Sequence, residues 1–134
     1  MQVGDGMSTI TASVGPQHGL RAASKTMVKN NCGSAVVYDP DSPGPSLITE
    51  RDILVALGRG LDIDEEIVCD HMTEAAITAT PEWSLERAAA EMSKRSIRHL
   101  VVVEGGGAVG ILSMRDIIRV WMTDGATSDM DALK

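Results

Sequence analysis

Hydrophobic positions in the first half of the chain predict alternating helices and strands. Leu20, Ala23 and Met27 recur at the spacing of one helical face, and a β-branched run follows them after a short polar break. A segment dense in proline, glycine and aspartate comes next and predicts a turn, because these residues disfavour the interior of a sheet. The predicted order is helix 19–30, strand 35–38, turn 39–45, strand 46–48 and helix 49–57.

The second half of the chain predicts the same order of elements from clearer signals. Ser84 is a favoured N-cap residue and precedes a helical apolar pattern. The run at 99–103 consists almost entirely of leucine and valine, which indicates a strand buried on both faces. The predicted elements are strand 77–79, a helix after Ser84, strand 99–103, turn 104–108, strand 109–112, helix 113–121 and a loose tail over 123–134.

The two halves are copies of one unit. Residues 48–54 return as residues 112–118, and upstream pairs such as Val3 and Val68 keep a constant spacing. The spacing changes by one residue only in the predicted turn, where changes of length are tolerated best. A unit of this size is only marginally stable alone because it buries little of its surface, so the copies are expected to form one structural module. The predicted parts are repeat 1 with an acidic connector (1–66), repeat 2 (67–122) and a flexible C-terminal tail (123–134).

Composition narrows the class of protein. With 43% hydrophobic residues, 2% aromatic residues and no phenylalanine among 134 residues, the core must consist of aliphatic side chains and methionine. The formal net charge of −7 argues against DNA or an anionic membrane as a partner, since both require basic surfaces. The chain shows neither a secretory leader nor an apolar run long enough to span a membrane. Cys32 and Cys69 lack the spacing of a disulfide framework or a zinc site, so a reducing, cytoplasmic location is expected.

The repeated segment carries a hydroxyl residue followed three positions later by an aspartate. A strand ends and a helix begins at Thr49 and again at Ser113, so unpaired N–H groups at the helix start favour a phosphate there. Asp52 or Asp116, one turn into the helix, can accept hydrogen bonds from both hydroxyls of a ribose. The same residues can instead form capping boxes that only stabilise the two helices.

The chain resembles the cystathionine-β-synthase (CBS) domain family in three features. These are the repeated motif, the Val-x-Asp-x-Met opening of each half and the order strand, helix, strand, strand, helix. The resemblance extends from Val3 to about Trp121 as one tandem pair. It implies an α/β (α+β) fold in which two β-α-β-β-α repeats pack sheet to sheet with pseudo-two-fold symmetry. It also implies that adenosine-containing ligands bind in the two clefts between the repeats.

The residues around the two motif copies predict sites of unequal strength. Arg98 and His99 open the central strand of the second half, where the first half has Gly33 and Ser34. In the family that the chain resembles, a basic residue at this strand start often meets a phosphate. The stronger predicted site comprises Ser113, Arg115, Asp116, Arg98, His99, Ile111, Leu112, Thr78 and Ala79, and the weaker one comprises Thr49, Arg51, Asp52, Leu47, Ile48 and Ser34.

The residues just before each motif also bear on the predicted pockets. Most members of the family carry a glycine there, as Gly110 does, but Ser46 stands at this place in the first half. A side chain at Ser46 is expected to narrow the first pocket or change its ligand. The apolar pairs 47–48 and 111–112 are expected to form the wall against which adenine lies.

We predict a regulatory module and not an enzyme, because no nucleophile has an evident base beside it. The expected ligand is AMP, ADP, ATP or S-adenosylmethionine, acting as an energy or metabolite signal through allosteric change, with no catalytic cofactor and no metal. A homodimer is expected through apolar residues at 53–54 and 117–118, and an unidentified regulated protein is the expected recipient of the signal. Two alternatives remain open: a ligand-free dimerisation or docking module, and a metal or redox sensor that uses Cys32 and Cys69.

Overall fold

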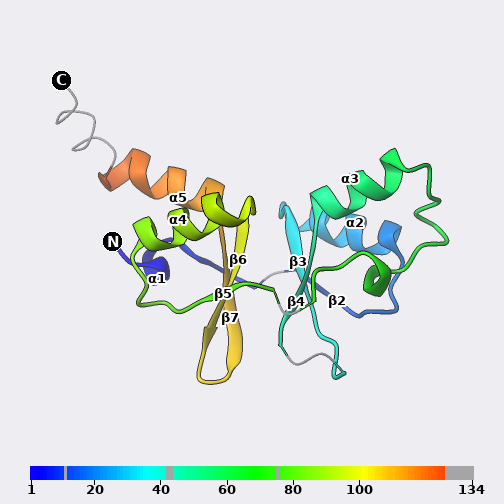
Figure 1. Cartoon of the computed structure of the whole chain (residues 1–134), viewed down its shortest axis with the longest axis horizontal. Helices are drawn as coiled ribbons and strands as arrows, with labels where there is room; N and C mark the ends of the chain where they lie inside the picture. Colours follow the sequence, from blue (N-terminus) through cyan, green and yellow to red (C-terminus); the bar gives the residue numbers. More distant parts are fainter. Residues whose placement is uncertain (11, 42–43, 75, 126–134) are drawn as a thin grey trace. The chain divides into compact units, whose positions relative to one another are not determined.

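The computed structural model describes residues 1–10, 12–41, 44–74 and 76–125, which form two compact units (Figure 1). The central unit spans Ile10–Ala76, and the terminal unit combines Met1–Thr9 with the chain from Ile77 onward. Each unit has its own sheet and its own hydrophobic core.

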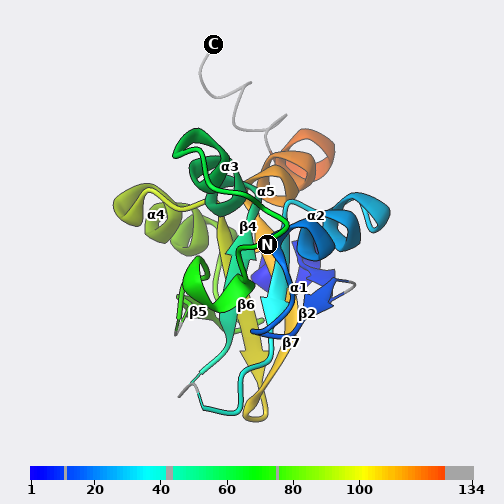
Figure 2. The same ribbon diagram turned by 90° about the vertical axis from the view of Figure 1, so that its right-hand side faces the viewer.

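The central unit is built on a three-stranded sheet with the order β2-β3-β4. Strand β2 runs parallel to β3, and β3 runs antiparallel to β4. Its elements are β2 (Ser13–Val14), α2 (Leu20–Lys29), β3 (Ser34–Val37), β4 (Ser46–Thr49), α3 (Glu50–Gly58) and the 3-10 helix η1 (Val68–Asp70). Figure 2 faces this unit and shows α2 and α3 at the same end of β3 and β4.

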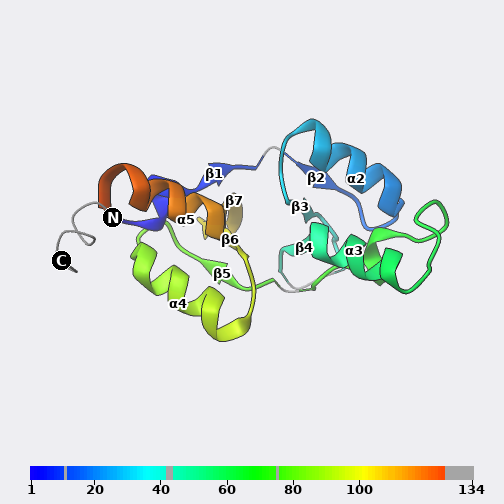
Figure 3. The same cartoon turned by 90° about the horizontal axis from the view of Figure 1, so that it is seen from above.

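The terminal unit is built on a four-stranded sheet with the order β1-β7-β6-β5. Its elements are α1 (Val3–Gly6), β1 (Ser8–Thr9), β5 (Thr78–Ala79), α4 (Leu85–Arg95), β6 (His99–Glu104), β7 (Gly107–Ser113), α5 (Met114–Val120) and the π-helical turn η2 (Trp121–Gly125). The hydroxyl of Ser84 accepts the N–H of Arg87 (3.1 Å), so the predicted N-cap of α4 is confirmed. Seen from above, α4 and α5 lie side by side (Figure 3).

The predicted order of strand, helix, strand, strand and helix is confirmed in both halves, and the fold is mixed α/β. A turn lies within the predicted range 104–108 but is shorter than predicted, because β6 continues to Glu104 and β7 already begins at Gly107. Gly105 and Gly106 alone make the turn, with φ angles of 61° and 82°. Two adjacent residues with positive φ allow a two-residue hairpin, and glycine adopts this conformation without strain. Residues 126–134 of the predicted tail lie outside the described residues.

Each unit also contains the opening segment of the other repeat. Residues Met1–Thr9 open repeat 1 but pack with repeat 2, and the start of repeat 2 packs inside the central unit. The N–H of Val3 donates to the carbonyl of Trp83 (2.7 Å). At the matching place, the N–H of Val68 donates to the carbonyl of His18 (2.8 Å). The two opening segments are therefore exchanged through equivalent hydrogen bonds.

The exchange also extends to the sheets. Strand β1 pairs with β7, so that Ser8 lies opposite Ile111, and the matching bridge joins Thr73 to Leu47. The predicted repeats, 1–66 and 67–122, describe the duplication in the sequence, whereas the compact units reflect the exchange of opening segments.

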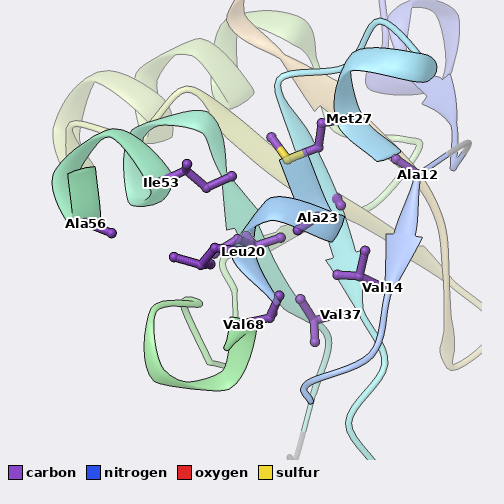
Figure 4. Packing of buried hydrophobic residues seen from close by; sticks show 11 residues of the cluster. Ala12, Val14, Leu20, Ala23, Met27, Val37, Ile53, Ala56 and Val68 are labelled. Carbon is purple, nitrogen blue, oxygen red and sulfur yellow. The ribbon is translucent and has the colours of Figure 1, made fainter. Parts of the chain in front are cut away.

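Each core is aliphatic and lies between the helices and one face of the sheet. Figure 4 shows the core of the central unit, which includes Ala12, Val14, Leu20, Ala23, Met27, Val37, Ile53, Ala56 and Val68. In the terminal unit Leu100 and Val102 belong to the core, whereas Val101 between them points to the opposite face of the strand. The second face of β6 is thus apolar as well, which matches the pattern predicted for 99–103.

No helix among the described residues is long and apolar enough to cross a membrane.

Candidate functional site

Thr49 marks the place in the central unit where β4 ends and α3 begins. Ser34 lies opposite Thr49 in the strand register, and the N–H of Glu50 donates to the carbonyl of Gly33 (2.9 Å). Oδ2 of Asp52 accepts hydrogen bonds from the N–H of Thr49 (2.8 Å) and from its hydroxyl (3.0 Å). The N–H of Asp52 donates back to Thr49 Oγ1 (3.3 Å). The structure therefore brings Thr49, Asp52 and Ser34 together at one helix start.

Ser113 occupies the matching place in the terminal unit, between β7 and α5. His99 lies opposite Ser113 in the register, and the N–H of Met114 donates to the carbonyl of Arg98 (2.9 Å). Oδ2 of Asp116 accepts the N–H of Ser113 (2.8 Å), and the N–H of Asp116 donates to Ser113 Oγ (3.0 Å). The backbone of Arg98 and His99 is therefore fixed beside the motif, as the duplication predicts.

Both motif copies form reciprocal capping boxes. The interpretation of the motif as a helix cap is therefore confirmed, and caps of this kind contribute about 1 kcal/mol of stability each. The capping bonds to the motif N–H groups use Oδ2 of each aspartate. Each Oδ1 is outside these capping bonds, and it is at this atom that the two copies differ.

Arg119 binds the second carboxylate oxygen of Asp116. Its Nη2 donates to Asp116 Oδ1 (3.2 Å) and to the carbonyl of Gly6 (3.2 Å). The guanidinium therefore ties helix α5 and the motif acid to the opening segment of the chain. Val55 stands at the matching position of α3. Within the part of the chain that the structure describes, Oδ1 of Asp52 makes no hydrogen bond.

The two motif hydroxyls differ as well. The hydroxyl of Thr49 donates its proton to Asp52 (3.0 Å). Ser113 Oγ accepts the N–H of Asp116 and, among the described residues, donates to no acceptor. A hydroxyl that keeps its proton can donate it to a ligand oxygen, whereas the Thr49 hydroxyl must first leave Asp52.

The basic residues predicted for the sites are accessible. Arg51, Arg98 and Arg115 are exposed, and His99 is half-buried. Each of these arginines lies next to a motif residue or a strand start in the sequence, so each guanidinium can approach an anion bound at its own motif.

The predicted apolar walls need a correction. Ile48 and Leu112 are both 0% exposed and belong to the two cores, so their side chains face the helices. Leu47 and Ile111 precede them in the strands and therefore point to the opposite face of each sheet. Ile111 is half-buried and can contact a base from that face, whereas Leu47 is only 5% exposed.

Strand β5 holds the last two residues of the stronger predicted site. Thr78 is half-buried and lies beside Val101, and Ala79 lies beside Val102 in the parallel register with β6. The side chain of Ala79 is buried in the core. Thr78 therefore offers its side chain, whereas Ala79 can offer only its backbone.

The difference between Gly110 and Ser46 has a structural origin. A Cβ atom at Gly110 would lie 2.7 Å from the carbonyl oxygen of Ser8, because Thr9 of β1 pairs directly with Gly110. In the central unit the bridge at Leu47 is not continued as a second ladder pair, and Ser46 is completely buried. The glycine is therefore required by the approach of β1, which the expectation of a narrowed ligand pocket did not include.

Sequence reasoning missed Arg119 as a residue of the site. Its signal is the spacing: Arg119 lies three residues after Asp116, the distance at which two helical side chains meet. The duplication strengthens this signal, because the matching residue Val55 is apolar.

The two cysteines lie in the central unit, and both are partly buried. Burial and the neighbouring Asp70 carboxylate raise the pKa of the Cys69 thiol, which disfavours the reactive thiolate form. Among the described residues no three cysteine, histidine or acidic side chains are grouped closely enough to hold a metal ion.

Comparisons with known proteins agree on one family. The family model of the CBS domain matches residues 65–123. The chain is 35% identical over 108 residues to protein MJ1225 of Methanocaldococcus jannaschii, a match that covers 81% of this chain and 38% of that protein. The chain spans between 38% and 64% of the length of four of the curated relatives that it matches.

Two solved structures match over nearly their whole length. The CBS domain protein PAE2072 from Pyrobaculum aerophilum, solved in complex with AMP, is 30% identical with a TM-score of 0.80, and the match covers 95% of this chain and 99% of that one. The CBS domain pair of protein MJ0100, solved with 5′-methylthioadenosine and S-adenosyl-L-methionine, is 26% identical with a TM-score of 0.80. That match covers 92% of this chain and 97% of the other.

Proposed function

The chain belongs to the CBS-domain family, and we propose that it is a regulatory module that binds an adenosine-containing ligand at its two motif copies. The observation that carries the proposal is the Ser113–Asp116 capping box with Arg98 and His99 fixed beside it. Two similar structures, of PAE2072 and MJ0100, hold AMP in one case and adenosyl compounds in the other, which supports the ligand class.

The roles of the residues follow from their positions. The Ser113 hydroxyl can donate to a phosphate oxygen, and the exposed guanidinium groups of Arg98 and Arg115 can pair with its charge. At the Thr49 copy, Asp52 keeps Oδ1 outside the capping bonds and can accept the hydroxyls of a ribose bound there. Ile111 offers an apolar surface on which an adenine can lie.

The proposed role of the module is to control the activity of a regulated protein. We infer that ligand binding shifts the balance between conformations of the module and so changes the activity of a regulated protein. The matched relatives are longer than this chain, and the regulated activity can lie in the additional part of such proteins or in a separate partner. A catalytic role is not part of the proposal, and neither a metal nor a redox reaction of the cysteines is required.

We further propose that two copies of the chain associate through α3 and α5. Leu54 on α3 is 67% exposed and Ile118 on α5 is 53% exposed, and the two residues match in the duplication. Large apolar side chains at such exposure favour contact with another apolar surface. Sedimentation of the full chain is expected to show a dimer, and Leu54→Asp with Ile118→Asp is expected to yield a monomer.

Thermal unfolding tests the ligand proposal directly. A ligand that binds the folded chain raises the unfolding temperature in proportion to the logarithm of its concentration over Kd. We expect at least one of AMP, ADP, ATP, S-adenosylmethionine and NADH to stabilise the chain at millimolar concentration. No stabilisation by any of the five compounds would leave a ligand-free docking module as the better interpretation.

A further inference from the structure

We propose that Arg119 sets the charge selectivity of the module, so that its two motif copies take different classes of adenosyl compound. The Ser113 copy takes a compound that carries a phosphate. The Thr49 copy takes an uncharged or cationic adenosyl compound. This inference rests on the proposed function and extends it to the specificity of each copy.

Arg119 is held in place beside the motif acid. One nitrogen of its guanidinium contacts both Asp116 Oδ1 and the carbonyl of Gly6, each at 3.2 Å. The Arg119 side chain is 60% exposed, whereas that of Asp116 is only 15% exposed. The positive charge therefore faces solvent while the negative charge is covered and satisfied by its partners.

This contact changes what Asp116 can recognise. Its Oδ2 accepts the N–H of Ser113 and its Oδ1 accepts Arg119, so a ribose hydroxyl must compete with a charged donor. The Ser113 hydroxyl keeps its proton for a ligand oxygen. The Ser113 copy is therefore better suited to an anionic acceptor than to a pair of ribose donors.

The Thr49 copy has the opposite character. Val55 replaces the arginine, so Asp52 keeps Oδ1 as a hydrogen-bond acceptor among the described residues. The Thr49 hydroxyl already donates to Asp52 and has no proton to spare for a phosphate. The Thr49 copy is therefore suited to donors, which a ribose supplies and a phosphate does not.

The surrounding charges reinforce this difference. The charged residues at the Ser113 copy are Arg98, Arg115, Asp116 and Arg119, and those at the matching positions of the Thr49 copy are Glu50, Arg51 and Asp52. The first set has an excess of positive charge and the second has an excess of negative charge. Exposed charges act weakly one by one, but several of one sign decide which ligand charge is accepted.

Titration of the isotopically labelled full chain by NMR measures both copies at once. The backbone amide signals of Asp52 and Asp116 report binding at each copy separately, with AMP and adenosine as probes. We expect AMP to bind the Ser113 copy about ten-fold more tightly than the Thr49 copy, and adenosine to show the reverse order.

Two substitutions exchange the residues at the matching positions 119 and 55 between the two motif copies. Arg119→Val is expected to reduce the preference of the Ser113 copy for AMP over adenosine, and Val55→Arg is expected to create such a preference at the Thr49 copy. Val55 is 41% exposed, so an arginine can be placed there without disturbing the core. Arg95→Val is the matched control, because Arg95 is an exposed arginine that pairs with Glu91 on α4 (2.9 Å).

The outcomes separate the inference from the function on which it rests. If neither AMP nor adenosine binds, the selectivity is overturned, and the proposed function is decided separately by thermal unfolding with the five compounds named above. If both compounds bind with the same preference at the two copies, or if Arg119→Val and Val55→Arg act no differently from Arg95→Val, the selectivity is overturned and the ligand-binding function stands.

Discussion

Among the described residues, the Asp52 side chain of the central unit is held by Thr49 alone, whereas Asp116 of the terminal unit is shared between Ser113 and Arg119. The backbone around both acids is the same: strand, cap and helix start coincide, and each helix donates its first N–H to the residue just before the neighbouring strand. The comparison teaches that capping fixes the position of the motif, while residues outside the motif decide its chemistry.

The exchanged opening segments offer the strongest test of the structural equivalence between the units. Val3 and Val68 match in the duplication, and both are 0% exposed. We expect Val3→Ala and Val68→Ala each to lower the free energy of unfolding by about 2 kcal/mol, since each removes buried methyl groups and leaves a cavity. Urea unfolding measures both, and Val28→Ala, at a residue 81% exposed, is the control. A loss confined to Val68→Ala would show that the opening segment of the chain is not held as the structure has it.

Gly110 and Ser46 occupy matching positions at which the two units differ in structure. Gly110→Ser forces a Cβ atom against the Ser8 carbonyl of β1, a backbone contact that cannot move without displacing the strand. We expect a loss of about 2 kcal/mol from this overpacking. The reverse substitution, Ser46→Gly, adds no atom and so meets no such clash; it removes a buried hydroxyl and adds freedom to the unfolded chain, and its expected cost of about 1 kcal/mol is smaller. Equal losses, measured by urea unfolding, would mean that β1 does not constrain Gly110.

The two caps provide a smaller and symmetric test. Ser113→Ala and Thr49→Ala each remove the acceptor for an N–H of the first helical turn, and each is expected to cost about 1 kcal/mol. Chemical unfolding of both variants measures the cost, with Thr49→Ser as a variant that keeps the cap. If Ser113→Ala lowered the free energy of unfolding much more than Thr49→Ala, the Ser113 hydroxyl would stabilise contacts other than the start of its helix.

Much of the fold could be predicted because the duplication repeats each local signal. The apolar face of α2, the cap at Ser84 and the order of elements all follow from short-range patterns, which the structure confirms. The family was also predicted correctly from the motif and the order of elements. The exchange of opening segments could not be predicted, because hydrogen bonds such as that from Val3 to Trp83 join residues far apart in the sequence.

The candidate site divides in the same way. The motif residues and the strand starts beside them come together as predicted, since adjacent strands fix their register. The part of the site that was missed depends on side-chain contacts across the unit. The spacing of Arg119 and Asp116 is a local pattern, but the contact of Arg119 with Gly6 is not, and which of two alternating strand residues faces the core depends on where the helices pack.

The smallest expected effect on stability comes from removing one exposed ion pair in each unit. Arg21 and Asp64 pair between α2 and the acidic connector (61–68), whereas Arg95 and Glu91 pair within α4. The hydrogen bond from Arg21 lowers the pKa of Asp64, so the folded chain holds this proton less strongly than the unfolded chain. The stabilisation is therefore complete above the ordinary pKa of 3.8 and is lost as the pH falls through the lowered value.

Arg21→Ala is expected to lower stability slightly at pH 7 and to have a vanishing effect at a pH well below 3.8, where Asp64 is protonated in both states. Urea unfolding at the two pH values measures the difference, and Arg95→Ala is the control within one helix. Because the Arg21 pair joins segments that lie far apart in the sequence, its loss is expected to raise amide exchange in the connector as well. Loss of the Arg95 pair is expected to change exchange only within α4. An Arg21→Ala effect that persists at the lower pH would assign the contribution of Arg21 to packing of its side chain and not to its charge.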